Sequence, residues 1–156
     1  MLQYSLFGIK PDVFYDKSIP REDGSGLKIP LPKPEDFIAE IIGELQKVGL
    51  EIKSERKYLV SREIALKHYS EHEFVYDIKS RISKQEFLAR YMVSDYSYWI
   101  VFYGENTIKL GREVLKNIRE KYLLTPWFAR YSLMHASDNP VGAIEEIKLH
   151  FPEFSF

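Results

Sequence analysis

The stretch that most restricts the fold is residues 97–103, SYWIVFY, which is followed by Gly104. Its aromatic and β-branched side chains are typical of a β-strand, and the glycine ends it. Weaker strand patterns occur at residues 3–9, 50–60 and 131–134. Because an isolated strand is not stable in water, we expect these runs to pair in one sheet.

Amphipathic helices separate the expected strands. Apolar residues recur at spacings of three and four in these segments, as they do along one buried helix face. The helices are expected to begin at or just after Glu35, Ser61, Ser83, Asn106 and Pro140. Gly49 is placed to end the first of them. This order predicts an α+β, ferredoxin-like fold of two split βαβ halves, with a four-stranded antiparallel sheet and the helices on one face.

The length of the chain fits a single domain over residues 1–156. Hydrophobic residues make up 45% and charged residues 29%, which is the balance of a globular protein. Residues 14–34 differ from the rest because they hold four of the eight prolines. We interpret them as a proline-rich insertion loop after the first strand.

Charge and composition exclude several functional classes. The net charge of −1 gives no general attraction to nucleic acid or anionic membranes, so neither is expected as a partner. The chain has no cysteine, which excludes disulfides and thiolate chemistry. It shows neither a signal peptide nor a run of about 20 apolar residues that could span a membrane. The expected location is the cytoplasm.

Two segments carry residues suited to phosphate chemistry. Lys10 follows the first strand in a Lys-Pro-Asp turn. His135 ends the short apolar run at the start of YSLMHASDNP (residues 131–140), and Ser137 lies two residues after it. A histidine nucleophile needs an acceptor on its second ring nitrogen, and Glu146 on the next helix can supply one. The spacing alone also fits an ordinary turn and a solvated histidine with a surface glutamate.

A basic row lies on the helix that follows residues 97–103. Arg112, Lys116 and Arg119 recur at spacings of four and three, so they share a helix face that could bind phosphates. The alternative is a simple solvated face. His68 and His72 could similarly bind a metal if their helix continued, although the adjacent glutamates favour a solvated helix end.

Taken in chain order, several segments resemble the nucleoside diphosphate kinase family. They are YSLFGIKPD, FIAEIIGELQKVGLEI, KHYSEH, RYMVSDYSYWIVFYGENTIKLGR at residues 90–112, and MHASDNPVGAIEEIKLHFPE. Each motif is weak alone, whereas their shared order is specific. The similarity spans most of residues 3–153 and leaves out the insertion and residues 117–130.

The resemblance implies a ping-pong kinase that uses nucleoside triphosphates and diphosphates, with Mg²⁺ bridging the phosphates. His135 would carry the phosphate, Glu146 would hydrogen-bond its far nitrogen, and Ser137 would orient Glu146. Lys10 would contact the transferred phosphate and the ribose hydroxyl. The resemblance also implies a homo-oligomer, a dimer or larger.

The nucleotide-binding residues implied by the resemblance lie on several segments. Tyr69 would shape the wall beside Lys10, and Arg112 would bind the outer phosphates. Arg119 and Arg130 are the candidates for a second phosphate-binding arginine. Ser132 stands where the family usually has a ribose-binding asparagine.

Further positions depart from the family pattern. Ile118 occupies the position of a phosphate-binding threonine, for which Thr125 is the substitute candidate. Phe74 and Phe87 are candidates for stacking on the base. These departures leave an alternative open, namely a nucleotide-binding or protein-interaction module that keeps the kinase fold with little or no turnover.

Overall fold

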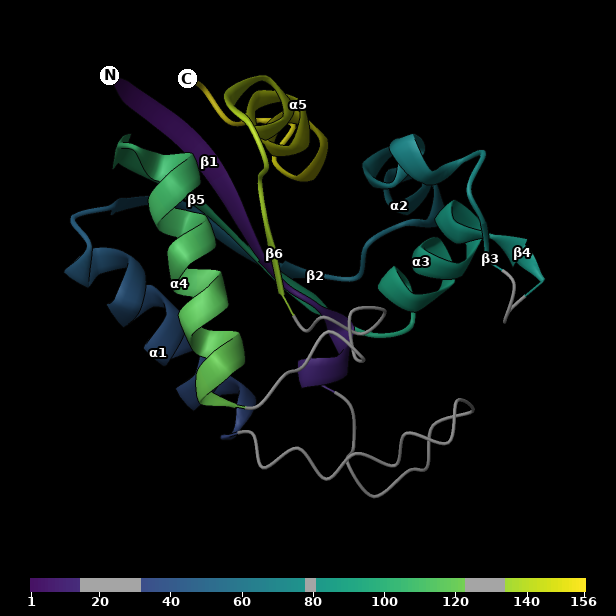
Figure 1. The fold of residues 1–156 in the computed structure, drawn as a ribbon, viewed down its shortest axis with the longest axis horizontal. Coiled ribbons are helices and arrows are strands. Elements are labelled where there is room, and N and C mark those ends of the chain that lie inside the picture. Colours follow the sequence, from purple (N-terminus) through teal and green to yellow (C-terminus); the bar gives the residue numbers. More distant parts are fainter. Residues whose placement is uncertain (15–31, 78–80, 123–133) are drawn as a thin grey trace.

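The computed structural model describes residues 1–14, 32–77, 81–122 and 134–156 (Figure 1). The strands are β1 (Leu2–Ile9), β2 (Glu51–Tyr58), β3 (Tyr76–Asp77), β4 (Ile82–Ser83), β5 (Ser97–Glu105) and β6 (Met134–Ala136). The helices are α1 (Pro34–Lys47), α2 (Arg62–His68), α3 (Lys84–Met92), α4 (Thr107–Lys121) and α5 (Pro140–His150), with short 3₁₀ turns at Pro11–Val13 and Ser70–His72.

The main sheet has four strands in the order β2-β5-β1-β6, and each neighbouring pair is antiparallel. β1 pairs with β5 along the whole length of β1, from Leu2 opposite Glu105 to Ile9 opposite Tyr98. The predicted α+β fold with a four-stranded antiparallel sheet is therefore confirmed. Residues 97–103 form an interior strand, as their apolar composition requires.

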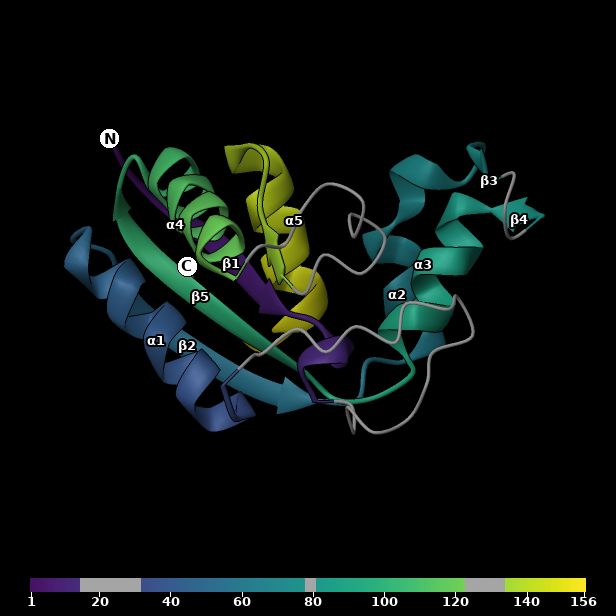
Figure 2. The same ribbon diagram turned by 60° about the horizontal axis from the view of Figure 1, so that its bottom comes forward.

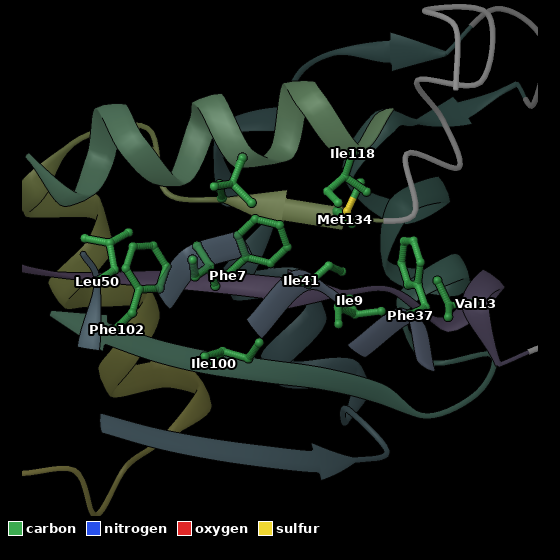
Figure 3. Close-up of a cluster of buried hydrophobic side chains, with 13 residues drawn as sticks. Phe7, Ile9, Val13, Phe37, Ile41, Leu50, Ile100, Phe102, Ile118 and Met134 are labelled. Carbon is green, nitrogen blue, oxygen red and sulfur yellow. The ribbon is translucent and has the colours of Figure 1, made fainter. Parts of the chain in front are cut away.

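Helices cover both faces of this sheet, so the expectation of helices on one face was wrong. Side chains of α1 and α4 pack on one face around Phe7, Ile100 and Phe102 (Figure 3). The opposite face packs Trp99 and Val101 against residues of α2, α3 and α5. Helices α2 and α3 lie side by side next to the β3–β4 hairpin (Figure 2). Successive residues of a strand point to opposite faces. Because consecutive β5 residues are apolar, both faces must be covered.

The helix ends follow local hydrogen-bonding rules with one exception. Ser61 and Ser83 accept hydrogen bonds from the backbone N–H groups of Ile64 and Glu86, at 3.2 and 3.1 Å, as their capping roles predict. Gly49 adopts a φ of 83° just after α1. Asn106 precedes α4 as expected, but with a φ of 54° its side chain makes no capping hydrogen bond.

Some boundaries differ from the sequence prediction. β6 begins at Met134 and continues through His135, whereas the strand was expected at residues 131–134, of which 131–133 lie outside the described residues. The β3–β4 hairpin was not predicted. Most of the expected insertion loop, residues 15–31, is also outside the described residues. Within the described parts of the chain, no helix combines the length and apolar character needed to cross a membrane.

Two helical glycines provide a matched test of the packing on α1 and α4. An added Cβ at Gly111 would lie 2.8 Å from Cζ of buried Phe102, whereas one at Gly43 meets nothing within 4 Å. We expect Gly43→Ala to raise the free energy of unfolding by about 0.5–1 kcal/mol. Gly111→Ala should lower it by about 1–2 kcal/mol because the core is overpacked. Urea unfolding measures both, and equal effects would contradict this packing.

Candidate active site

A row of three paired residues places His135 at the edge of the sheet. Gly8 of β1 lies opposite Trp99 of β5 on one side and opposite His135 of β6 on the other. A Cβ at Gly8 would lie 2.4 Å from the Trp99 ring, so the indole occupies the space that a side chain would need. The Trp99 and His135 ring centroids are 6.0 Å apart. The glycine therefore lets the indole lie beside the histidine.

Glu146 of α5 holds one side of the His135 ring. Its Oε1 lies 2.9 Å from His135 Nε2, and its Oε2 accepts a 2.5 Å hydrogen bond from Ser137 Oγ. Ser137 is buried and is fixed by β1, because its Oγ accepts from the Leu6 N–H at 3.2 Å and its own N–H donates to the Leu6 carbonyl. The predicted group of His135, Glu146 and Ser137 thus comes together in space.

This arrangement assigns different roles to the two ring nitrogens of His135. Nε2 is buried and at hydrogen-bonding distance from Glu146, although its N–H is not aligned on that oxygen for a hydrogen bond. A carboxylate beside Nε2 favours the tautomer that carries its proton there. Nδ1 then keeps its lone pair and is the nitrogen available as a nucleophile.

Lys10 reaches the same region from the end of β1. Its side chain is buried, and its Nζ lies 5.8 Å from the ring centroid of Tyr69 and 6.0 Å from that of Tyr91. Aromatic faces attract a cation at such distances. The predicted neighbourhood of Lys10, Tyr69 and His135 is present, because all of them line one cavity.

That cavity has a volume of about 810 Å³, which suits a ligand of nucleotide size. Its wall combines cationic, aromatic and acidic side chains, including Lys10, His68, Tyr69, Phe87, His135, Asp138, Glu145 and Glu146. Of the two base-stacking candidates, Phe87 lies in this wall, whereas Phe74 is 94% exposed and is not part of it.

The basic face of α4 divides into different environments. Arg112 is half-exposed and forms an ion pair with Asp138, three residues after His135. Lys116 is exposed and lies 3.8 Å from Glu120 on its own helix. Arg119 donates a 3.3 Å hydrogen bond to the carbonyl of Met134, and burial lowers the pKa of its guanidinium. Arg112 thus combines two properties: its side chain is exposed to solvent, and it contacts the segment that follows His135.

The sequence did not predict a group of histidines behind His135. The ring of His68 lies 4.7 Å from that of His135 and 5.0 Å from that of His150, centroid to centroid. His68 Nδ1 is 3.1 Å from His150 Nε2, and His150 Nδ1 is 2.6 Å from the Tyr58 hydroxyl. His68 therefore does not form the solvated helix end that was expected. His150 also stacks on Trp99 at 3.7 Å.

These histidines are uncharged near neutral pH. Burial lowers the pKa of His150 to about 3, with smaller contributions from His135 and Arg56. Burial and the neighbouring His135 also lower the pKa of His68 well below its ordinary value. A signal for His150 was available, because it lies four residues after Glu146 and so shares its helix face.

Several predicted residues cannot be placed or take another role. Ser132, Arg130 and Thr125 lie outside the described residues. Ile118 is 2% exposed in the core between α1 and α4, so it does not supply a phosphate contact. The helix on which His68 and His72 could together have bound a metal does not continue to His72, since α2 ends at His68.

Sequence comparisons relate this chain to known proteins. The family model for nucleoside diphosphate kinase matches residues 33–156. The nucleoside diphosphate kinase of Thermococcus kodakarensis is 31% identical over 124 residues, which cover 77% of this chain and 71% of that protein. The Pyrococcus abyssi protein of the same name is 33% identical over 125 residues, or 74% of each chain.

Solved structures share the fold at lower sequence identity. Nucleoside diphosphate kinase from Encephalitozoon cuniculi has a TM-score of 0.70 at 20% identity, covering 96% of this chain and 88% of that one. A nucleoside diphosphate kinase family protein from Babesia bovis has a TM-score of 0.71 at 18% identity, covering 99% and 93%.

The buried neutral state of His150 has a measurable consequence. Its native pKa is about 3, far below the unfolded value near 6.5, so the unfolded chain binds one more proton between these values. Stability is therefore lost as the pH falls. In His150→Phe, the slope of the unfolding free energy against pH between about pH 4 and 5.5 should decrease by about 1.4 kcal/mol per pH unit.

Urea unfolding at several pH values measures this slope. Lys148→Ala changes an exposed residue of the same helix and serves as the control, which should keep the wild-type slope. An unchanged slope in His150→Phe would contradict a neutral histidine at this position.

Proposed function

The chain belongs to the nucleoside diphosphate kinase family, and we propose that it transfers the terminal phosphate of a nucleoside triphosphate to a nucleoside diphosphate through a phosphohistidine on His135. The observation that carries this proposal is the 2.9 Å contact between His135 Nε2 and Glu146, which Ser137 supports from the other carboxylate oxygen. This contact leaves Nδ1 as the attacking nitrogen at the wall of the cavity.

In the first half-reaction, Nδ1 attacks the terminal phosphorus while the bond from that phosphorus to the bridging oxygen breaks. The nucleoside diphosphate leaves, and the ring of His135 becomes positively charged because Nε2 keeps its proton. Glu146 stabilises this charge through its adjacent carboxylate. In the second half-reaction, the terminal phosphate oxygen of another diphosphate attacks the phosphohistidine, which restores the neutral imidazole.

Cationic side chains neutralise the transferred phosphate. Lys10 is held in the cavity wall with its ammonium near two tyrosine rings. Its positive charge therefore already lies at the cavity when the phosphate binds. Arg112 would exchange its carboxylate partner, Asp138, for the outer phosphates of the nucleotide. Arg119 binds the backbone of Met134, which supports a role in positioning β6 next to His135.

Mg²⁺ is proposed as the cofactor, carried on the nucleotide phosphates. Asp138 is paired with Arg112, and Glu146 is engaged by His135 and Ser137, so these carboxylates are already occupied. An octahedral ion held mainly by phosphate oxygens and water fits such a site. The bound ion would neutralise charge on the phosphates during transfer.

We also propose that the chain forms a homo-oligomer, a dimer or larger, and that it acts in the cytoplasm. Neither nucleic acid nor a membrane is proposed as a partner, in keeping with a net charge of −1. Sedimentation equilibrium would measure the oligomeric state directly.

A binding module without turnover is the second candidate. The burial of Ile118 favours it, since the corresponding family threonine contact is missing from α4. Such a module would bind nucleotide in the same cavity but would not form or transfer the phosphohistidine.

Incubation with Mg²⁺ and γ-labelled ATP separates the two candidates. We expect one acid-labile, alkali-stable phosphoryl group on the wild type, and its release when a nucleoside diphosphate is added. His135→Ala should carry no label, whereas Lys148→Ala, which alters an exposed residue of α5 outside the cavity wall, should be labelled normally. Glu146→Ala should slow labelling by about 10²-fold. An unlabelled wild type that still binds ATP would support the module.

Arg112 provides a test of the phosphate site. Arg112→Ala should raise the KM for the nucleoside triphosphate by about tenfold, because a charge-assisted contact to the phosphates is lost. Lys109→Ala changes another exposed cation of α4 and should leave the KM within about twofold, since its partner is Glu113 on its own helix. Equal effects in steady-state kinetics would show a general charge effect instead of a specific contact.

A further inference from the structure

We propose that His68, His135 and Glu146 form an inhibitory Zn²⁺ site at the phosphate-accepting histidine. The three residues come from α2, β6 and α5, and each offers one ligand atom within 4.8 Å of the others. Two imidazole nitrogens with one carboxylate, leaving a fourth position open, are ligands typical of zinc and poorly suited to magnesium.

The ligands are close to the spacing that a zinc ion requires. A tetrahedral ion with bonds of about 2.0–2.2 Å separates its ligand atoms by about 3.4 Å. His135 Nε2 and Glu146 Oε1 are already 2.9 Å apart. His68 is the last residue of α2, and no separation between ligand atoms in this group exceeds 4.8 Å, which is about 1.4 Å more than a bound zinc ion would set.

Hydrogen bonds behind the ligands support the same assignment. Metal-bound histidines usually donate their second N–H to a neighbouring acceptor, and ligating carboxylates are themselves hydrogen-bonded. His68 Nδ1 can donate to His150 Nε2 at 3.1 Å, and His150 can in turn donate to the Tyr58 oxygen at 2.6 Å. Ser137 occupies the second oxygen of Glu146. The free nitrogen of His68 in this arrangement is Nε2.

Zinc at this site would block phosphorylation through the tautomer of His135. A neutral imidazole that binds metal through Nε2 carries its proton on Nδ1. Nδ1 then has no lone pair with which to attack phosphorus. Metal binding and phosphorylation are thus mutually exclusive, and this consequence rests on the proposed function, whereas the metal site itself does not.

Zinc binding can be measured directly by competition with a chromogenic zinc chelator in excess Mg²⁺. We expect one Zn²⁺ per chain, with affinity lowered at least about tenfold in His68→Asn and in Glu146→Gln, and about 10–100-fold in His150→Phe. His72→Asn is the matched control and should bind as the wild type does. Equal binding by all the variants, or an equal loss in the control, would identify an adventitious ion only and overturn the site.

A second measurement uses the wild type alone and does not depend on how the variants fold. In ¹⁵N-histidine-labelled protein, long-range ¹H–¹⁵N spectra should show that zinc moves the ring proton of His135 from Nε2 to Nδ1. A proton that stays on Nε2 at saturating zinc would overturn the proposal. Failure of the kinase would appear separately, as an unlabelled wild type in metal-stripped protein with Mg²⁺ and ATP.

Discussion

The packing of the Trp99 indole over Gly8 is the constraint on which the rest of the site depends. Both residues lie in the interior of the sheet, and the indole fills the space where another residue would place its side chain. His135 pairs with the same glycine from the other side. The nucleophile therefore stands next to a rigid aromatic wall, and β6 needs few residues of its own to fix it.

This wall also explains why uncharged histidines can lie behind the nucleophile. His150 stacks on the indole at 3.7 Å, and His68 makes an edge contact with it at 5.3 Å. A charged imidazole would be poorly solvated there, so both rings are neutral and are hydrogen-bonded to each other. Polar groups thus reach close to the core without an unpaired charge, while Glu146 provides the negative charge next to His135.

Much of the fold could be predicted because its signals are local. The strand at residues 97–103, the caps at Ser61 and Ser83, and the stop at Gly49 depend on neighbours within a few residues. The covering of both faces was missed although its cause was visible, since alternate residues of β5 are apolar on each side. The short β3–β4 hairpin has two-residue strands, which carry no periodic pattern to detect.

The candidate site was predictable in part for a different reason. His135, Ser137 and Glu146 lie within twelve residues of one another, so their spacing allowed a common site without requiring it, and the order of the family motifs joined them with Lys10. The contacts of His68 with His150 join residues 82 positions apart in the chain, and no local pattern specifies them. The departures at Ser132 and Arg130 concern residues outside the described ranges.

Helix α5 supplies partners to two different rings from one face. Glu146 holds His135, and one turn later His150 holds His68, which itself contacts His135. A rotation or shift of α5 moves Glu146 and His150 at once. The contact of Glu146 with His135 therefore cannot change without the contact of His150 with His68. Substitutions on this helix face are therefore expected to combine non-additively, and changes that improve one contact have to be compensated at the other.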